Sequence, residues 1–199
     1  MEYQTYTTDA LVLGGIAKGE ANKRLVLLTR TFGVVRADVQ RVRDTRSKLR
    51  YALQQYSLAR VSLVYGKGGW RVVNAVPRFS FWARFRRTPS RTRHAAARLS
   101  LISRRLMVAE EVHTNAFFIV YEAWSALASS TLTSADADAI EGIAVARLLY
   151  DLGYLAPTKQ VAPFLAGGVM TRERAASFRA VRADAVAAIN ASLEATQLM

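Results

Sequence analysis

The stretch Val34–Arg50, with the sequence VVRADVQRVRDTRSKLR, decides how the first part of the chain is expected to fold. It opens with a short apolar, β-branched run over residues 34–39, which is typical of a half-buried strand. Between residues 40 and 48 the only apolar side chain is Val42, so this part is predicted to be a surface loop. Its many cations would face solvent or a polyanion, and a loop that only aids solubility is the alternative.

Short strands separated by turns are predicted on both sides of this stretch. Residues 57–65 alternate between two faces, and Gly66–Gly69 forms a glycine-rich hairpin turn before the next strand. Residues 49–54 read as a short helix. The five predicted strands are residues 5–13, 24–30, 34–39, 57–65 and 70–76. Five strands with a helix between the third and the fourth indicate a small closed barrel of the OB type, which commonly binds single strands through one face and its loops.

Composition excludes several classes of function. The chain of 199 residues has no cysteine and two histidines, which excludes disulfides and thiolate metal sites and leaves no zinc cluster or local catalytic triad. No phosphate-binding loop motif is present, so we expect no enzyme, no cofactor and no metal. The N-terminus lacks the apolar segment of a signal peptide, and no run approaches the about 18 apolar residues of a membrane span. A cytoplasmic protein is expected.

The net charge of +13 is concentrated in the first 110 residues. Residues 1–80 hold 14 Lys and Arg against five Asp and Glu, and residues 81–110 hold eight against one. Residues 111–199 hold six against nine. Clustered cations favour a polyanionic partner, because neutralised phosphates release their counterions and the field steers association.

Residues 77–93 (PRFSFWARFRRTPSRTR) interleave aromatic side chains with arginines. Pro77 and Pro89 are expected to break regular structure, so residues 81–93 read as a basic junction between two domains. The aromatic residues would either stack bases or dock the barrel onto the helical part, and the arginines would extend the path of the polyanion.

Residues 94–199 are predicted to form a mildly acidic, four-helix domain. The third helix is expected to stop at Gly153, and Thr171 is expected to cap a last helix. The inward face of that last helix would carry Phe178, Val181, Ala185 and Ile189. Such a domain suits protein docking. The cations predicted to border a docking groove are Arg98, Arg104, Arg105 and Arg147.

The order of several motifs resembles the RecO family, the bacterial recombination mediators of DNA repair. The matching segments are T-x-A-L-V-L at Thr8–Leu13, Gly19-Glu20 with L-x-L-L-T-R at Leu25–Arg30, a basic S-K-L segment at 46–49, A-L-Q-x-aromatic-S at Ala52–Ser57, and LLYDLGYLAP at Leu148–Pro157. The chain departs from the family pattern at Ala21-Asn22, at Arg41, where the family has glycine, and at Gln55. Many members carry a four-cysteine zinc site after the Gly-Tyr-x-Pro segment, whereas residues 158–163 contain no thiol.

The resemblance implies an α+β, multi-domain protein with an N-terminal five-stranded OB-fold β-barrel (residues 1–80) followed by an α-helical domain. It implies a non-catalytic protein that binds single- and double-stranded DNA, anneals strands, contacts RecR and the tail of the single-stranded-DNA-binding protein, and helps to load the recombinase. An RNA-binding or ribosome-associated OB protein, or a protein–protein adaptor, is the alternative. The predicted DNA-binding residues are Lys23, Arg24, Arg36, Arg41, Arg43, Arg46, Lys48, Arg50, Lys67, Trp70, Arg71, Arg84, Arg86 and Arg87.

Overall fold

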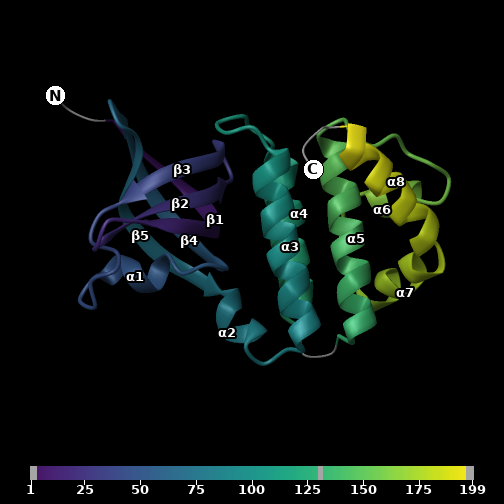
Figure 1. Ribbon diagram of the computed structural model, residues 1–199. Coiled ribbons are helices and arrows are strands. Elements are labelled where there is room, and N and C mark those ends of the chain that lie inside the picture. The colour runs from purple at the N-terminus through teal and green to yellow at the C-terminus, as the bar shows by residue number, and fades with distance from the viewer. Residues whose placement is uncertain (1–3, 130–131, 196–199) are drawn as a thin grey trace. The chain divides into compact units, whose positions relative to one another are not determined.

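The first part of the chain folds as a five-stranded barrel. The computed structural model describes residues 4–129 and 132–195 (Figure 1). The barrel elements are β1 (Thr5–Lys18), β2 (Asn22–Thr29), β3 (Gly33–Val39), α1 (Lys48–Ala52), β4 (Ser57–Gly66) and β5 (Gly69–Ser80). The strands close in the order β1-β2-β3-β5-β4, antiparallel except for the parallel pairing of β3 with β5. This is the predicted OB barrel, with α1 between β3 and β4, so the predicted fold class is confirmed.

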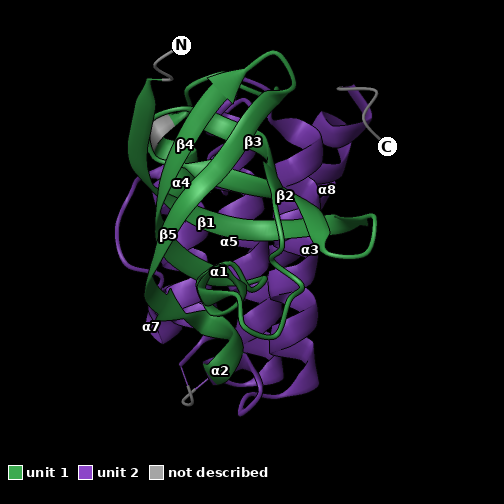
Figure 2. Ribbon diagram, turned by 90° about the vertical axis from the view of Figure 1, so that its left-hand side faces the viewer, with its two compact units in different colours: residues 1–83, 108–117 green, residues 84–107, 118–199 purple. Residues whose placement is uncertain are grey.

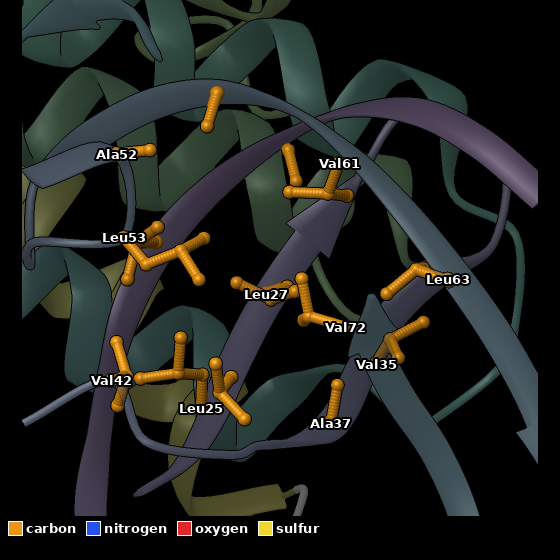
Figure 3. Packing of buried hydrophobic residues seen from close by; sticks show 14 residues of the cluster. Leu25, Leu27, Val35, Ala37, Val42, Ala52, Leu53, Val61, Leu63 and Val72 are labelled. Atoms are coloured by element: carbon orange, nitrogen blue, oxygen red, sulfur yellow. The ribbon is translucent and has the colours of Figure 1, made fainter. Parts of the chain in front are cut away.

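Alternation along the strands places one set of side chains inside the barrel. Figure 3 shows Leu25, Leu27 and Val35 pointing into a common apolar cluster with residues of the other strands. Val42 lies in the same cluster and is buried. The surface loop predicted at residues 40–48 thus contacts the core at one point, because the Val42 side chain anchors it to the barrel.

Gly33 begins β3 at a position that tolerates no side chain. Its φ is +60°, and a Cβ placed there would lie 1.8 Å from the carbonyl oxygen of Glu111. The segment around Glu111 follows β3, since Ala109 pairs with Val34 and the Glu110 amide donates to the Val34 carbonyl at 2.9 Å. Residues 108–117, which were expected in the helical domain, therefore belong to the barrel unit.

The last strand continues past Pro77. β5 reaches Ser80, and the pairing with β4 skips Arg78, because Leu58 is opposite Phe79 while Ala59 is opposite Pro77. A proline is tolerated at such a bulge, where its missing N–H costs no ladder hydrogen bond. The expected break at Pro77 was wrong. A short helix, α2 (Phe81–Phe85), follows directly, and Pro89 is the N-cap of the next helix.

The chain divides into two compact units, residues 1–83 with 108–117 and residues 84–107 with 118–199, which Figure 2 shows in different colours. The remaining elements are α3 (Ser90–Leu106), α4 (Thr114–Leu127), α5 (Ser134–Asp151), α6 (Ala162–Leu165), α7 (Arg172–Ala180) and α8 (Arg182–Ala195). Helix α5 is buried along most of its length and packs against α3, α6, α7 and α8.

Local signals set the ends of these helices. Thr133 and Asp136 form a reciprocal capping box at the start of α5, and Gly153, with a φ of +78°, follows its end as predicted. Thr171 caps α7 as expected, but the last helix is interrupted at Val181, where α7 ends and α8 begins. No helix in the described ranges is long and apolar enough to cross a membrane.

Candidate nucleic-acid interface

The loop between β3 and α1 is held in shape by the turn between β1 and β2. The Arg43 amide donates to the Ala21 carbonyl at 3.0 Å, and the Arg43 guanidinium donates to the Gly19 carbonyl at 3.1 Å. The Arg41 amide donates to the Asn22 side chain at 2.9 Å. With Val42 buried beneath, this fixes the backbone of the loop, while the Arg41, Arg43 and Arg46 side chains remain exposed.

Arg41 adopts the left-handed conformation, with a φ of 52°. Non-glycine residues rarely occupy this region, because the Cβ crowds the following carbonyl. The RecO family, which this sequence resembles, has glycine at this position. Arg41 thus keeps the backbone conformation that glycine permits and adds a cation. The Arg41 guanidinium lies 3.3 Å from the Asp44 carboxylate, and Asp44 also accepts the Arg46 amide at 3.0 Å. Hydrogen bonding to the Arg46 amide is the largest effect that lowers the pKa of Asp44.

Asp38, on the outer face of β3, organises two cations of the barrel surface. Arg24 donates to the Asp38 carboxylate at 2.7 and 3.0 Å, and the Lys18 ammonium lies 2.5 Å from it. These hydrogen bonds, first that of Arg24, lower the pKa of Asp38 from 3.8 to about 2. Arg24 is thus paired with a carboxylate, whereas it was predicted as a DNA contact, and Lys18 is a neighbouring cation that the predicted set omitted.

A shallow cavity of about 290 Å³ lies beside this group, at the β4–β5 hairpin. Strand register places Arg24 opposite Asp38 and Asp38 opposite Arg71, so one row of charged side chains crosses β2, β3 and β5. Asp38, Arg71 and Lys67 all line the cavity. The structure therefore brings together the predicted residues Arg24, Lys67 and Arg71 with the hairpin glycines.

Trp70 lines the same cavity but is packed among other rings. It makes edge-on contacts with Tyr6 and Tyr65, with ring centroids 5.6 and 5.1 Å away, and its centroid lies 5.4 Å from that of Phe32. The side chain is half-buried and packs against the barrel core. This arrangement favours a structural role for Trp70 over a free stacking platform. Tyr65, which is 54% exposed, offers more open aromatic surface at the hairpin.

The other predicted DNA-binding side chains are on the surface. Lys23 on β2, Arg36 on β3, and Lys48 and Arg50 on α1 are exposed. Arg84, Arg86 and Arg87 are exposed too, but they belong to the helical unit.

The predicted rim of a docking groove is only partly present. Arg147 is 2% exposed and donates to the carbonyls of Phe164, Ala166 and Gly168, as well as to Glu122. Its assignment to an exposed rim was wrong, because the guanidinium satisfies backbone carbonyls of a loop. Burial lowers the pKa of Arg147, and Arg174 contributes in the same direction.

Arg98 does border a groove of about 320 Å³ formed by α3, α5, α7 and α8. Its guanidinium pairs with the Glu141 carboxylate, and the neighbouring Arg91 pairs with Asp138 at 2.7 Å. Arg104 and Arg105 lie in the last turn of α3, where cations favour the helix dipole, and neither lines this groove.

The helical unit has other bounds than the expected domain and therefore another charge. Residues 84–107 and 118–199 contain 14 Lys and Arg and eight Asp and Glu, so the unit is basic, whereas the mildly acidic domain was expected over residues 94–199. The reason is that residues 84–107, which carry eight arginines in the end of α2, the following turn and α3, belong to the same unit as the later helices. In the described ranges, no group of three side chains of the metal-ligating types lies close enough to hold an ion.

Comparison with known proteins identifies the barrel. Residues 1–76 match the family model described as "Recombination protein O N terminal". No curated protein matches the chain. The matched range covers β1 to β4 and most of β5, and it includes the basic loop and the Asp38 group. The barrel is therefore similar to the N-terminal domain of RecO-family proteins, and this match covers 76 of the 199 residues of the chain.

Proposed function

We propose that this chain is a RecO-family, non-catalytic DNA-binding protein that binds and anneals single strands and mediates recombinase loading in recombinational repair. The family match supports a DNA-binding role in recombination and repair. The family resemblance supports the finer assignment to single strands, annealing and loading, and the exposed basic loop of the barrel supports strand binding.

The observation that carries the proposal is the basic loop between β3 and α1, which is bonded to the β1–β2 turn. Its backbone is fixed by Val42 and by hydrogen bonds to the β1–β2 turn, whereas its guanidinium groups are exposed. A preorganised set of cations on an OB barrel can contact successive phosphates at a lower entropic cost than a mobile loop. Lys67 and Arg71 line the cavity at the hairpin together with Gln40, the residue that directly precedes Arg41.

The first experiment is a competition between DNA and RNA single strands of equal length and sequence. Phosphate contacts and base stacking alone do not distinguish the two sugars, so a measured preference for DNA would support the repair role. Preference for RNA would favour the alternative of an RNA-binding protein. Failure to bind either strand at low salt would overturn the proposal.

A second experiment tests the loop itself. Replacing Arg43 and Arg46 with alanine should lower the slope of log affinity against log salt by about 1.4 for a single strand, about 0.7 for each phosphate that is no longer neutralised. Arg60→Ala is the matched control, since Arg60 is an exposed arginine on β4 outside the predicted set. An unchanged slope in the double variant would reject the loop as the phosphate contact.

The proposed protein partners are RecR and the acidic, apolar tail of the single-stranded-DNA-binding protein. The groove bordered by Arg98 supports the second of these, because Ile102, Val145 and Val186 give it an apolar floor. Titration of the tail peptide against the full chain should give salt-sensitive, micromolar binding, about −8 kcal/mol. Val186→Asp should abolish it, and binding that survives this change would place the peptide elsewhere.

A further inference from the structure

A second cleft on the barrel unit lies between α1 and the end of β5. It encloses about 300 Å³, at the lower end of small-ligand sites. Its walls are Tyr51, Ser57, Pro77, Arg78, Phe79 and Ser80. The cleft exists because β5 continues through Pro77 and because the bulge at Arg78 leaves that residue unpaired with β4.

Two aromatic side chains of the cleft are largely open to solvent. Tyr51 is 63% exposed and Phe79 is 42% exposed. Phe79 is held by an edge-on contact with the buried Phe81, with ring centroids 4.8 Å apart. Two exposed aromatic side chains that line the same cleft, one on a strand and one on a helix, are available to stack on a planar ligand.

The charges around the cleft favour an anionic ligand. None of the described residues that line it is acidic, and Arg78 is part of its wall. Lys48 and Arg50 lie on the same short helix as Tyr51, are exposed, and take part in no ion pair among the described residues. Since α1 begins directly after the basic loop, the cationic path of that loop leads to the cleft.

We infer that the cleft binds an unpaired base of a single-stranded nucleic acid, stacked on Tyr51 and Phe79, with Arg78 at the adjacent phosphate. This inference rests on the proposed function and adds to it a base-binding site. Aromatic faces accept any base, but only when that base is free of its duplex partner. The site would therefore distinguish single strands from duplexes, which the phosphate-binding loop alone does not.

Tyr51→Ala tests the inference without disturbing the core, because Tyr51 is exposed. Anisotropy of the full chain is measured with labelled oligo-dT and with an abasic strand of the same length. We expect Tyr51→Ala to weaken binding of oligo-dT about tenfold, the value of one stacked base, and to leave binding of the abasic strand unchanged. Tyr51→Phe should retain wild-type affinity, since stacking does not need the hydroxyl.

Tyr150→Ala is the matched control, a similarly exposed tyrosine of the helical unit. Equal affinities of Tyr51→Ala and the wild type for oligo-dT would overturn the inference and leave the proposed function intact. An equal loss on both strands would also overturn it, because the residue would then act through the backbone or the fold. If the wild type binds neither strand, the proposed function fails and the base site fails with it.

Discussion

Replacing Asp38 with asparagine separates the structural role of this carboxylate from its effect on the cations beside it. Asparagine keeps the shape and one acceptor but removes the charge that Lys18 and Arg24 share. A pKa of about 2, against the ordinary value of 3.8, corresponds to about 2 kcal/mol of stability at neutral pH. The two cations are 52% and 43% exposed, so screening reduces the expected loss to about 1 kcal/mol.

The same substitution should strengthen DNA binding. Lys18 and Arg24 would no longer be neutralised, and a phosphate near them would lose a repulsive neighbour worth about 1 kcal/mol at 4 Å in water, or about fivefold in affinity. If both cations then contact phosphates, the salt slope for a single strand should steepen by about 1.4. The variant is thus predicted to be less stable and to bind more tightly.

Salt-dependent anisotropy and chemical denaturation of the same preparations measure both effects. Glu20→Gln is the control, because it removes one exposed negative charge from the β1–β2 turn without releasing a paired cation. Weaker binding in Asp38→Asn would refute the reasoning and show instead that Asp38 positions the cations for the phosphate. An equal gain in Glu20→Gln would attribute the effect to net charge alone.

The stability difference between wild type and Asp38→Asn should also depend on pH. Because the folded-state pKa lies below the unfolded value of 3.8, the contribution is fully present above that value and is lost as the pH falls through about 2. Denaturation at a series of pH values should therefore show that the difference in the free energy of unfolding between the two proteins disappears as the pH falls from about 3.8 to about 2. A difference that persists below pH 2 would mean that packing, not charge, causes it.

Three further substitutions have defined outcomes. Arg41→Gly removes about 1–2 kcal/mol of backbone strain, but it raises the entropy of the unfolded chain by about 0.5–1 kcal/mol and loses the pair with Asp44. The free energy of unfolding should therefore change by less than about 1 kcal/mol, and a larger loss would refute the strain argument. Trp70→Ala should cost about 2–3 kcal/mol in denaturation, because its packing against the neighbouring rings disappears, and unchanged stability with weakened strand binding would make Trp70 a stacking platform after all. Arg147→Met should lower the free energy of unfolding by about 3–5 kcal/mol and make residues 158–170 accessible to limited proteolysis. An unchanged cleavage pattern would show that this loop keeps its structure without Arg147.

The barrel was predictable because its signals are local. Alternating apolar residues, the short hairpin at Gly66–Gly69 and the helix near Leu49 each limit the chain to few conformations, and together they indicate the OB topology. Thr171 and Gly153 likewise marked helix ends through caps that act within one turn. These elements needed no knowledge of distant contacts.

The misplaced features depend on distant contacts. A charged residue within a helical pattern is expected at the surface, so Arg147 was assigned to a rim although three loop carbonyls hold it inside. Pro77 signals a break unless the partner strand offers a bulge, which only the β4 pairing reveals. Asp38 as a shared partner of two cations follows from the register of β2 against β3, which periodicity does not fix.

The parallel contact between β3 and β5 is short, with only Ala37 opposite Trp70 and Asp38 opposite Arg71. The other strand pairs of the barrel are much longer, so the pairing of β3 with β5 is the weakest connection between strands. Local opening should start there, and amide hydrogen exchange of these residues should be faster than that of the β1–β2 ladder. A strand of nucleic acid bound across Asp38 and Arg71 would bridge β3 and β5, so the bound barrel would open locally less often than the free barrel.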